Sequence, residues 1–375
     1  MLGSATPSLE SLYNAGQGKY RWHKLRKRAT RAELPDWKVL DLRQHMVFHG
    51  LAAAAVEAIE ETLARGEQAM VFLNRRGYSP VLMCQQCGWH GSCERCDANL
   101  TWHRSRGLLC CHHCGSQRRA PALCPDCRAD ALMGAGEGTQ QLEEGLAEHF
   151  PDVPVWRFDR DRVARRGAMD RQLERVRAGG PGLLVGTQML AKGHHFPRVT
   201  LVVIVSVDQA LYSADFRAME RMGQMLQQVA GRAGRSEHPG TVVLQTLHPD
   251  NPALDLLLRE GYGAYARWLL EERTQACLPP AGYQALLRAE AHDRAQVQHF
   301  LEEAAAQFPA GPVSIHGPLP ALMERLGGRS RMYLLLQSAD RGALHRQVDS
   351  WLPRLRVLDS ARKVRWSIDM DPQEL

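Results

Sequence analysis

The chain has 375 residues, of which 44% are hydrophobic and 23% are charged, so it is long enough to form two or three domains with buried cores. Lysine and arginine total 47 against 41 acidic residues, a formal charge of +6, which permits nucleic-acid binding without requiring it. No apolar run approaches the ~20 residues of a membrane-spanning helix, and the sequence opens without a signal peptide. A disordered chain and a disulfide-stapled peptide are excluded, and a cytoplasmic protein without a membrane partner is predicted.

The first 45 residues show little regular pattern. Gly3-Ser4-Ala5-Thr6-Pro7 follows the start without a preceding helix or strand pattern. A basic run without an acidic residue comes next, at Lys19, Arg21, Lys24, Arg26, Lys27, Arg28 and Arg31. The pattern predicts a linker, and two interpretations stay open: a solvated connector or a contact with DNA.

From residue 51 onward, helical and strand patterns alternate. Helices are expected at 51–65, 139–149, 162–177, 216–230 and 253–276. Strands are expected at 69–73, 155–158, 183–185, 199–207 and 241–246. Apolar strands that alternate with helices indicate a parallel sheet covered on both faces, an α/β fold over residues 46–276. After Leu278-Pro279-Pro280, strands near 284–291, 313–315, 332–337 and 363–368 with two helices predict a small α+β domain over 277–375.

Nine of the ten cysteines lie between Cys84 and Cys127. Eight of them form four Cys-x-x-Cys pairs, Cys84/Cys87, Cys93/Cys96, Cys111/Cys114 and Cys124/Cys127. Two such pairs complete a closed tetrahedral zinc site, so eight thiolates predict two structural zinc ions in an insertion at 82–130. Closed ligand sets leave no open position for catalysis.

Three pairings of these motifs are possible, and the nested one is favoured. It places Cys84, Cys87, Cys124 and Cys127 on one ion and Cys93, Cys96, Cys111 and Cys114 on the other. Cys110 is then spare, and His90, His112 and His113 are alternative ligands. Trp89, Trp102 and Arg104 could form a surface for DNA or a partner, or the tryptophans could simply pack.

The string Gln228-Val-Ala-Gly-Arg-Ala-Gly-Arg235 places Arg232 and Arg235 just beyond an expected helix. Guanidinium groups fork onto phosphate oxygens and stay charged, which suits a site that neutralises phosphoryl-transfer charge. The string resembles the QxxGRxGR element of superfamily-two helicases. Gly3 to Pro7 resembles their Ser-Ala-Thr coupling motif, and the stretches Phe72 to Gly77 and Gly186 to Pro197 resemble motifs of the second RecA-like lobe.

Together with a double-zinc insertion, these motifs resemble the replication-restart helicases of the primosomal protein N′ (PriA) family across essentially the whole chain. The resemblance implies a second RecA-like lobe and ATP-driven 3′→5′ DNA unwinding with magnesium. It implies catalytic roles for Gln228, Arg232 and Arg235, nucleotide contacts at Gly193, Arg232 and Arg235, and DNA contacts at Asn74, Arg75, Arg76 and Thr187.

The resemblance also implies partners: forked and single-stranded DNA, other primosome proteins, and the acidic, aromatic-ended tail of single-stranded DNA-binding protein. Such a tail calls for a guanidinium beside an apolar pocket, and Arg43 and Arg341 are the two candidate positions. His345, one helical turn after Arg341, could contribute at low pH. A nucleoid-associated monomer is expected.

Two elements of a complete ATPase are missing from this sequence. It contains neither a Gly-x-x-x-x-Gly-Lys-Ser/Thr loop nor an Asp-Glu-x-His stretch, and the glycines at 134, 136 and 138 lack the lysine. Two hypotheses follow. The chain is the C-terminal part of a helicase and is inactive alone, with residues 1–45 the end of the first lobe and a linker, or it is a non-enzymatic, zinc-stabilised module that binds DNA and partners.

Overall fold

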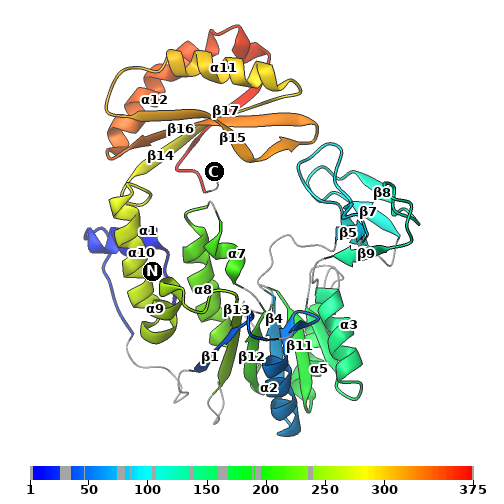
Figure 1. Cartoon of the computed structure of the whole chain (residues 1–375). Helices are drawn as coiled ribbons and strands as arrows, with labels where there is room; N and C mark the ends of the chain where they lie inside the picture. Colours follow the sequence, from blue (N-terminus) through cyan, green and yellow to red (C-terminus); the bar gives the residue numbers. More distant parts are fainter. Residues whose placement is uncertain are drawn as a thin grey trace. The chain divides into compact units, whose positions relative to one another are not determined.

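A computed structural model of the chain describes residues 3–25, 35–45, 47–73, 81–84, 86–103, 107–135, 139–158, 168–187, 190, 196–205, 207–213, 215–234 and 240–373 (Figure 1). The chain divides into two compact units. The first comprises residues 1–78 and 137–269, and the second comprises residues 79–136 and 270–375. Among the described helices, none combines the length and apolar character needed to cross a membrane.

The first unit is built on a six-stranded parallel sheet in the order β1-β13-β12-β4-β11-β10. Its strands are β1 (Asp36–Asp41), β4 (Gln68–Phe72), β10 (Val155–Phe158), β11 (Gly182–Gly186), β12 (Val199–Ile204) and β13 (Thr241–Thr246). Every residue of β4, β11 and β12 is buried. Since neighbouring side chains of a strand point to opposite faces, both faces of the sheet are covered. The predicted α/β class is confirmed.

Helices connect these strands. They are α1 (Leu9–Gly16), α2 (Ala53–Ala64), α3 (Thr139–His149), α5 (Ala168–Ala178), α7 (Asp208–Leu211), α8 (Ala218–Ala230), α9 (Pro252–Glu260) and α10 (Tyr262–Gln275). On one face of the sheet, Ile59 of α2 and Leu146 of α3 share a buried cluster with Val71, Val185 and Val203. A two-residue hairpin, β2 (Val47–Phe48) with β3 (Leu51–Ala52), precedes α2.

Two segments of the first unit differ from the expectation, and a third can be compared with it only in part. The single helix expected over 253–276 is wrong: Gly261, with φ 80°, separates α9 from α10. The helix α1 and the strand β1 lie in residues 1–45, where a linker was expected, and β1 pairs with β13 as the edge strand of the sheet. The expected helix at 162–177 is described only from Ala168, and residues 159–167 lie outside the described part.

The second unit has two parts. Residues 270–375, here called the C-terminal domain, form an antiparallel sheet in the order β15-β16-β14-β17. Its elements are β14 (Tyr283–Ala291), α11 (Arg294–Ala306), β15 (Ser314–Leu326), β16 (Arg329–Ser338), α12 (Arg341–Arg356), a short 3-10 turn (Ser360–Arg362) and β17 (Arg365–Met370). Trp351 of α12 is fully buried in the core, and its indole N–H donates to the Ala304 carbonyl at 2.9 Å.

The strand β15 is much longer than the 313–315 segment expected. Pro318 and Pro320 interrupt its pattern, and its register against β16 shifts at both places. Proline removes a ladder donor, so a sequence pattern with two prolines argues against a strand. β15 tolerates these prolines because it is the edge strand of the sheet, and an edge strand leaves half of its N–H groups unpaired.

Residues 79–136, here called the zinc module, form the other part of the second unit. Five short antiparallel strands lie in the order β8-β7-β6-β5-β9. They are β5 (Val81–Cys84), β6 (Thr101–His103), β7 (Leu108–Cys110), β8 (Gln117–Arg119) and β9 (Leu132–Ala135). The module has a small core, in which Leu82, Leu100 and Leu109 pack against cysteines. So little apolar area is a weak source of stability.

Candidate functional site

The zinc module brings its eight paired cysteines together in two groups. Cluster A consists of Cys84, Cys87, Cys124 and Cys127, and cluster B consists of Cys93, Cys96, Cys111 and Cys114. In each group the four sulfur atoms lie within 4.8 Å of one another. This is the nested arrangement, in which the outer two motifs share one site and the inner two share the other.

The sulfur positions fit zinc. The Sγ–Sγ distance is 3.6 Å for Cys84 and Cys127, 3.5 Å for Cys87 and Cys124, and 3.7 Å for Cys93 and Cys114. Four sulfurs held at ~2.3 Å from one ion in a tetrahedron are separated by about 3.8 Å. A disulfide would bring a pair to about 2 Å. The described thiols are therefore arranged as closed four-cysteine zinc-binding sites.

Backbone turns hold the ligands. The N–H of Gly88 donates to the Cys84 carbonyl at 3.0 Å, that of Gly115 to Cys111 at 2.9 Å, and that of Arg128 to Cys124 at 3.0 Å. All three donors have positive φ angles, at 77°, 75° and 63°. Glycine accepts this conformation without strain, which explains why Gly88 follows the motif ending at Cys87 and Gly115 follows the motif ending at Cys114.

Hydrogen bonds and burial act in opposite directions on the thiols. A hydrogen bond with the Ser116 hydroxyl, with Sγ–Oγ at 3.3 Å, lowers the pKa of Cys114 to about 6. The backbone N–H of Cys87 lowers the pKa of Cys84 to about 7. Burial raises the pKa of Cys96 to about 12. Because zinc binds thiolates, its binding at either cluster is accompanied by the release of thiol protons.

The other polar and aromatic candidates of the module lie outside the two ligand groups. His90, His112 and His113 are exposed and belong to neither cluster. Trp89 and Trp102 pack against the small core, which favours the packing interpretation over a partner surface. Arg104 lies outside the described residues.

The Ser-Ala-Thr segment and the Gln228 string meet in the first unit. The Gln228 side-chain amide, in the last turn of α8, donates to the Thr6 hydroxyl at 3.3 Å. The two residues are 222 positions apart in the sequence. The segment that resembles a coupling motif is thus in direct contact with the string that carries the two arginines.

The helix α1 and the residue Pro7 before it are hydrogen-bonded to α8 and α10. The buried backbone N–H of Leu9 donates to the Glu220 carboxylate of α8 at 3.0 Å, and Glu220 is only 5% exposed. The Tyr262 hydroxyl of α10 donates to the Pro7 carbonyl at 2.8 Å. Sequence reasoning missed Glu220 and Tyr262; an acidic residue on the otherwise apolar face of α8 was the available signal.

Arg232 lies in a turn after α8 that is fixed on two sides. Its N–H donates to the Val229 carbonyl at 2.9 Å, and the N–H of Gly234 donates to the carbonyl of Val199 at the start of β12 at 3.2 Å. A Cβ atom on Gly240 would come within 2.4 Å of the Gly234 nitrogen, so only glycine permits this approach. Arg235 and Gly193 lie outside the described residues.

Thr187 follows β11 at the carboxyl edge of the parallel sheet. Gly186 of β11 pairs with Phe72 of β4, and the N–H of Leu73 donates to the Gly186 carbonyl at 2.9 Å. Leu73, the last described residue after β4, therefore lies beside the residue that precedes Thr187. Asn74, Arg75 and Arg76 themselves lie outside the described part.

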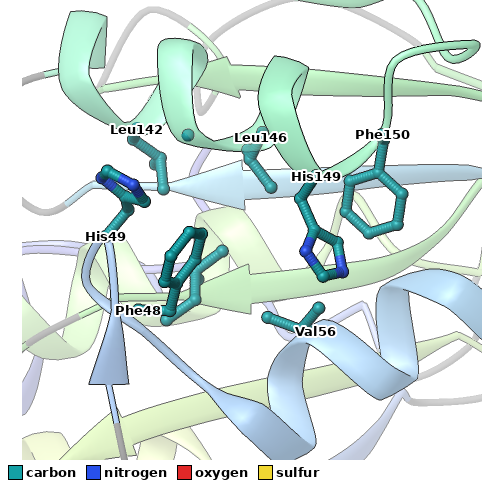
Figure 2. A pocket seen from close by; sticks show the side chains of 9 residues that line it. Phe48, His49, Val56, Leu142, Leu146, His149 and Phe150 are labelled. Carbon is teal, nitrogen blue, oxygen red and sulfur yellow. The ribbon is translucent and has the colours of Figure 1, made fainter.

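A small apolar niche lies elsewhere in the first unit. Figure 2 shows Phe48, the last residue of β2, near His149 of α3, while His49 of the following turn lies beside Leu142 of the same helix; Leu146 and Phe150 also line the niche. The cavity volume of this niche is about 10 Å³, about the space of one water molecule and far below the ~300 Å³ at which ligand pockets begin. The His149 ring nitrogen lies 3.1 Å from the Glu60 carboxylate. These contacts hold α3 against the hairpin and against α2, and no ligand is assigned to them.

Comparison with known proteins gives the family. The family model "PriA DNA helicase Cys-rich region (CRR) domain" matches residues 93–119, and "Primosomal protein N C-terminal domain" matches residues 274–373. The replication restart protein PriA of Haemophilus influenzae is 43% identical over 378 aligned residues, which include all of this chain and 52% of that protein. The chain belongs to the PriA family.

Other PriA proteins are similar over the same range. The protein of Bacillus subtilis is 35% identical, with 99% of this chain and 47% of that protein aligned. The protein of Synechocystis is 36% identical, with 90% of this chain and 42% of that protein aligned. The chain thus spans about half the length of the PriA proteins it matches.

The two arginines considered for a PriA partner lie in different units. Arg43, in the first unit, donates two hydrogen bonds to Asp41, at 2.8 Å from Nε and 2.7 Å from Nη2, and this pairing lowers the pKa of Asp41 to about 2. Arg341 opens α12 in the second unit and lies 2.8 Å from the Asp371 carboxylate. Both side chains remain more than half exposed, at 53% and 59%.

Proposed function

We propose that this chain supplies the second RecA-like lobe, the zinc module and the C-terminal domain of an ATP-dependent 3′→5′ DNA helicase that restarts replication. Membership of the PriA family supports this function. The proposed domain limits are 1–45, 46–276 with its zinc insertion at 82–130, and 277–375. ATP and magnesium would be held jointly with a second lobe that carries the phosphate loop.

One observation carries the proposal: the hydrogen bond between Gln228 and Thr6. A helicase must transmit the state of its nucleotide to its DNA contacts, and a direct bond between the Ser-Ala-Thr segment and the arginine-bearing string is a physical route for that signal. Gln228, Arg232 and Arg235 are the proposed catalytic residues, with Gly193, Arg232 and Arg235 at the nucleotide.

The test is DNA-stimulated ATP hydrolysis. The chain alone should show none, because a phosphate-loop lysine and an acidic magnesium ligand are two of the largest electrostatic contributions to phosphoryl transfer. Fused to the amino-terminal half of the Haemophilus influenzae PriA protein, it should hydrolyse ATP in a DNA-dependent manner. Steady turnover by the isolated chain, insensitive to Arg235→Ala, would contradict the proposal.

The alternative function is a non-enzymatic, zinc-stabilised module that binds DNA and partners. The sequence favours it in one respect, since it contains no phosphate loop. A fusion that binds DNA with the affinity of the Haemophilus influenzae protein but does not hydrolyse ATP would support this alternative.

DNA binding by the chain should depend steeply on salt. Asn74, Arg75, Arg76 and Thr187 are the proposed contacts, and contacts with phosphates position the strand without reading sequence. Replacing Arg75 and Arg76 together by alanine should lower the slope of log affinity against log salt by about 1.4 for single-stranded DNA. The measurement is fluorescence anisotropy with a labelled oligonucleotide at several salt concentrations.

Replacing Arg259 and Arg267 by alanine is the matched control, since these arginines lie on α9 and α10 and belong to none of the motifs that supply the proposed contacts. An unchanged slope in the Arg75/Arg76 variant would remove both residues from the DNA site.

Arg341 and Arg43 are the proposed contacts for the acidic tail of single-stranded DNA-binding protein. Arg341→Ala should weaken binding of a tail peptide by about 10-fold, since charge-assisted hydrogen bonds contribute roughly 1.5–3 kcal/mol. Asp371→Ala should strengthen it, because Asp371 competes for the same guanidinium. Calorimetric titration measures both, with Arg356→Ala as the control. Unchanged affinity in Arg341→Ala and Arg43→Ala would exclude both arginines.

A further inference from the structure

The hairpin of β15 and β16 ends in a tight turn at Gly327 and Gly328. Both residues have positive φ angles, 61° and 80°. Two such residues form the turn whose twist matches that of the flanking strands. The hairpin tip, defined as Arg325 to Arg329, is thereby held in one conformation.

Backbone hydrogen bonds join this tip to the zinc module. The N–H of Asp97 donates to the Arg325 carbonyl at 2.8 Å, and the N–H of Gly328 donates to the Arg95 carbonyl at 2.6 Å. In return, the N–H of Arg325 donates to the Asp97 carboxylate at 2.5 Å. The Arg95 guanidinium donates to the Gly327 carbonyl at 3.1 Å. The tip therefore pairs with the segment that carries two cluster B ligands.

Apolar contacts support the same attachment. Met323 and Leu326 of β15 pack against the small core that contains Leu82, Leu100 and Leu109. A module with so small a core gains a meaningful fraction of its burial from these two side chains.

The tip also contacts a metal ligand. The N–H of Gly327 donates to Sγ of Cys96 at 3.1 Å, and Cys96 is only 1% exposed. A hydrogen bond to a metal-bound thiolate orients the ligand and tunes the site from outside its first coordination sphere. The other described contacts to cluster B sulfurs come from the module itself, such as the N–H of Arg95, which donates to Cys93, and the Ser116 hydroxyl, which lies 3.5 Å from the same sulfur.

Cluster A has no described hydrogen-bond donor from the hairpin tip. The described donors to its sulfurs are backbone groups of its own turns, such as the N–H groups of Gln86 and Cys87 on Cys84 and of Ala129 on Cys127. The two zinc sites therefore depend on different parts of the chain.

We propose that the hairpin tip is an outer-sphere hydrogen-bond donor of cluster B. Zinc binding at cluster B and attachment of the C-terminal domain to the zinc module would then stabilise each other. Cluster A stands outside this coupling. Reciprocity follows from linkage: if attachment raises the affinity for zinc, zinc must strengthen attachment by the same factor. The coupling is independent of ATP hydrolysis and does not rest on the proposed helicase function.

The first test follows zinc release. In a Cys84→Ser background only the cluster B ion remains, and its release to a colorimetric chelator can be timed. Adding Arg95→Ala and Asp97→Ala should speed release by about 10-fold or more, the usual cost of losing an outer-sphere partner. Glu94→Ala is the matched control, since Glu94 lies in the same turn but pairs with Arg118 inside the module. An unchanged rate, or equal acceleration by Glu94→Ala, would overturn the proposal.

The second test reads the coupling in the opposite direction. Trypsin cleaves after Arg325 and Arg329, which attachment protects. Cys93→Ser should accelerate cleavage at these two positions by about 10-fold, while Cys84→Ser should leave it near the native rate. Mass spectrometry of the fragments identifies the sites. Equal acceleration in both variants would mean that the module simply unfolds, and no acceleration in Cys93→Ser would mean that the tip holds without zinc; either result contradicts the coupling.

Discussion

Replacing Cys124 by serine should leave the purified protein with one zinc ion per chain instead of two. Cys124 is fully buried in cluster A, and a serine hydroxyl is a poor substitute for a thiolate. Structural zinc contributes on the order of 10–16 kcal/mol of apparent binding free energy to the fold around it. The turns that carry the cluster A ligands, at residues 84–88 and 124–128, should therefore lose their ordered structure, while cluster B keeps its ion. Elemental analysis of the purified variant measures the metal content.

Cys110→Ser is the control for this prediction. Cys110 lies on β7 and belongs to neither cluster, so this variant should retain both ions. Loss of both ions in Cys124→Ser would show that the clusters fill as one unit, and retention of both would show that Cys124 is not a ligand.

The second large effect concerns the arginines after α8. In the fusion with the amino-terminal half of the Haemophilus influenzae protein, Arg232→Ala and Arg235→Ala should be compared one at a time. The variant that removes the arginine finger should lower DNA-stimulated turnover by about 10³-fold, because that guanidinium stabilises charge that develops only in the transition state. Measurement of ATP hydrolysis at saturating nucleotide separates this loss from weaker binding.

Arg259→Ala is a suitable control for the arginine variants, since Arg259 is exposed on α9 and pairs with Asp255. Its turnover should stay within twofold of the parent fusion. If neither Arg232→Ala nor Arg235→Ala falls below that control, neither arginine acts on the transferred phosphoryl group.

Much of the fold could be predicted from the sequence, where burial dictated the pattern. The central strands β4, β11 and β12 are buried on both faces, so they appear as largely apolar runs, in which only Gln68 and Thr200 are polar. The edge strand β1 escaped notice for the opposite reason: Asp36, Lys38 and Asp41 give it a polar sequence, which an edge position tolerates and a sequence pattern does not reveal.

Part of the candidate site could likewise be predicted from the sequence, and part of it could not. The spacing of the cysteines limits which thiols can meet, so the nested grouping could be predicted before any coordinates. The bond between Gln228 and Thr6 could not, because it joins residues 222 positions apart through side-chain geometry. The contact of Gly327 with Cys96 is harder still, since glycine offers only a backbone N–H and carries no chemical signature.

The zinc module is translated well before the β15–β16 hairpin that contacts it. The zinc module ends at residue 136, and β15 starts only at Ser314, so the ribosome adds roughly 180 residues in between. At about 5–20 residues per second this takes roughly 9–36 s. During that interval the nascent zinc module depends for its stability on its own turns and on bound zinc. The hydrogen bond from the Gly327 N–H to the Cys96 sulfur can form only after Gly327 has been translated.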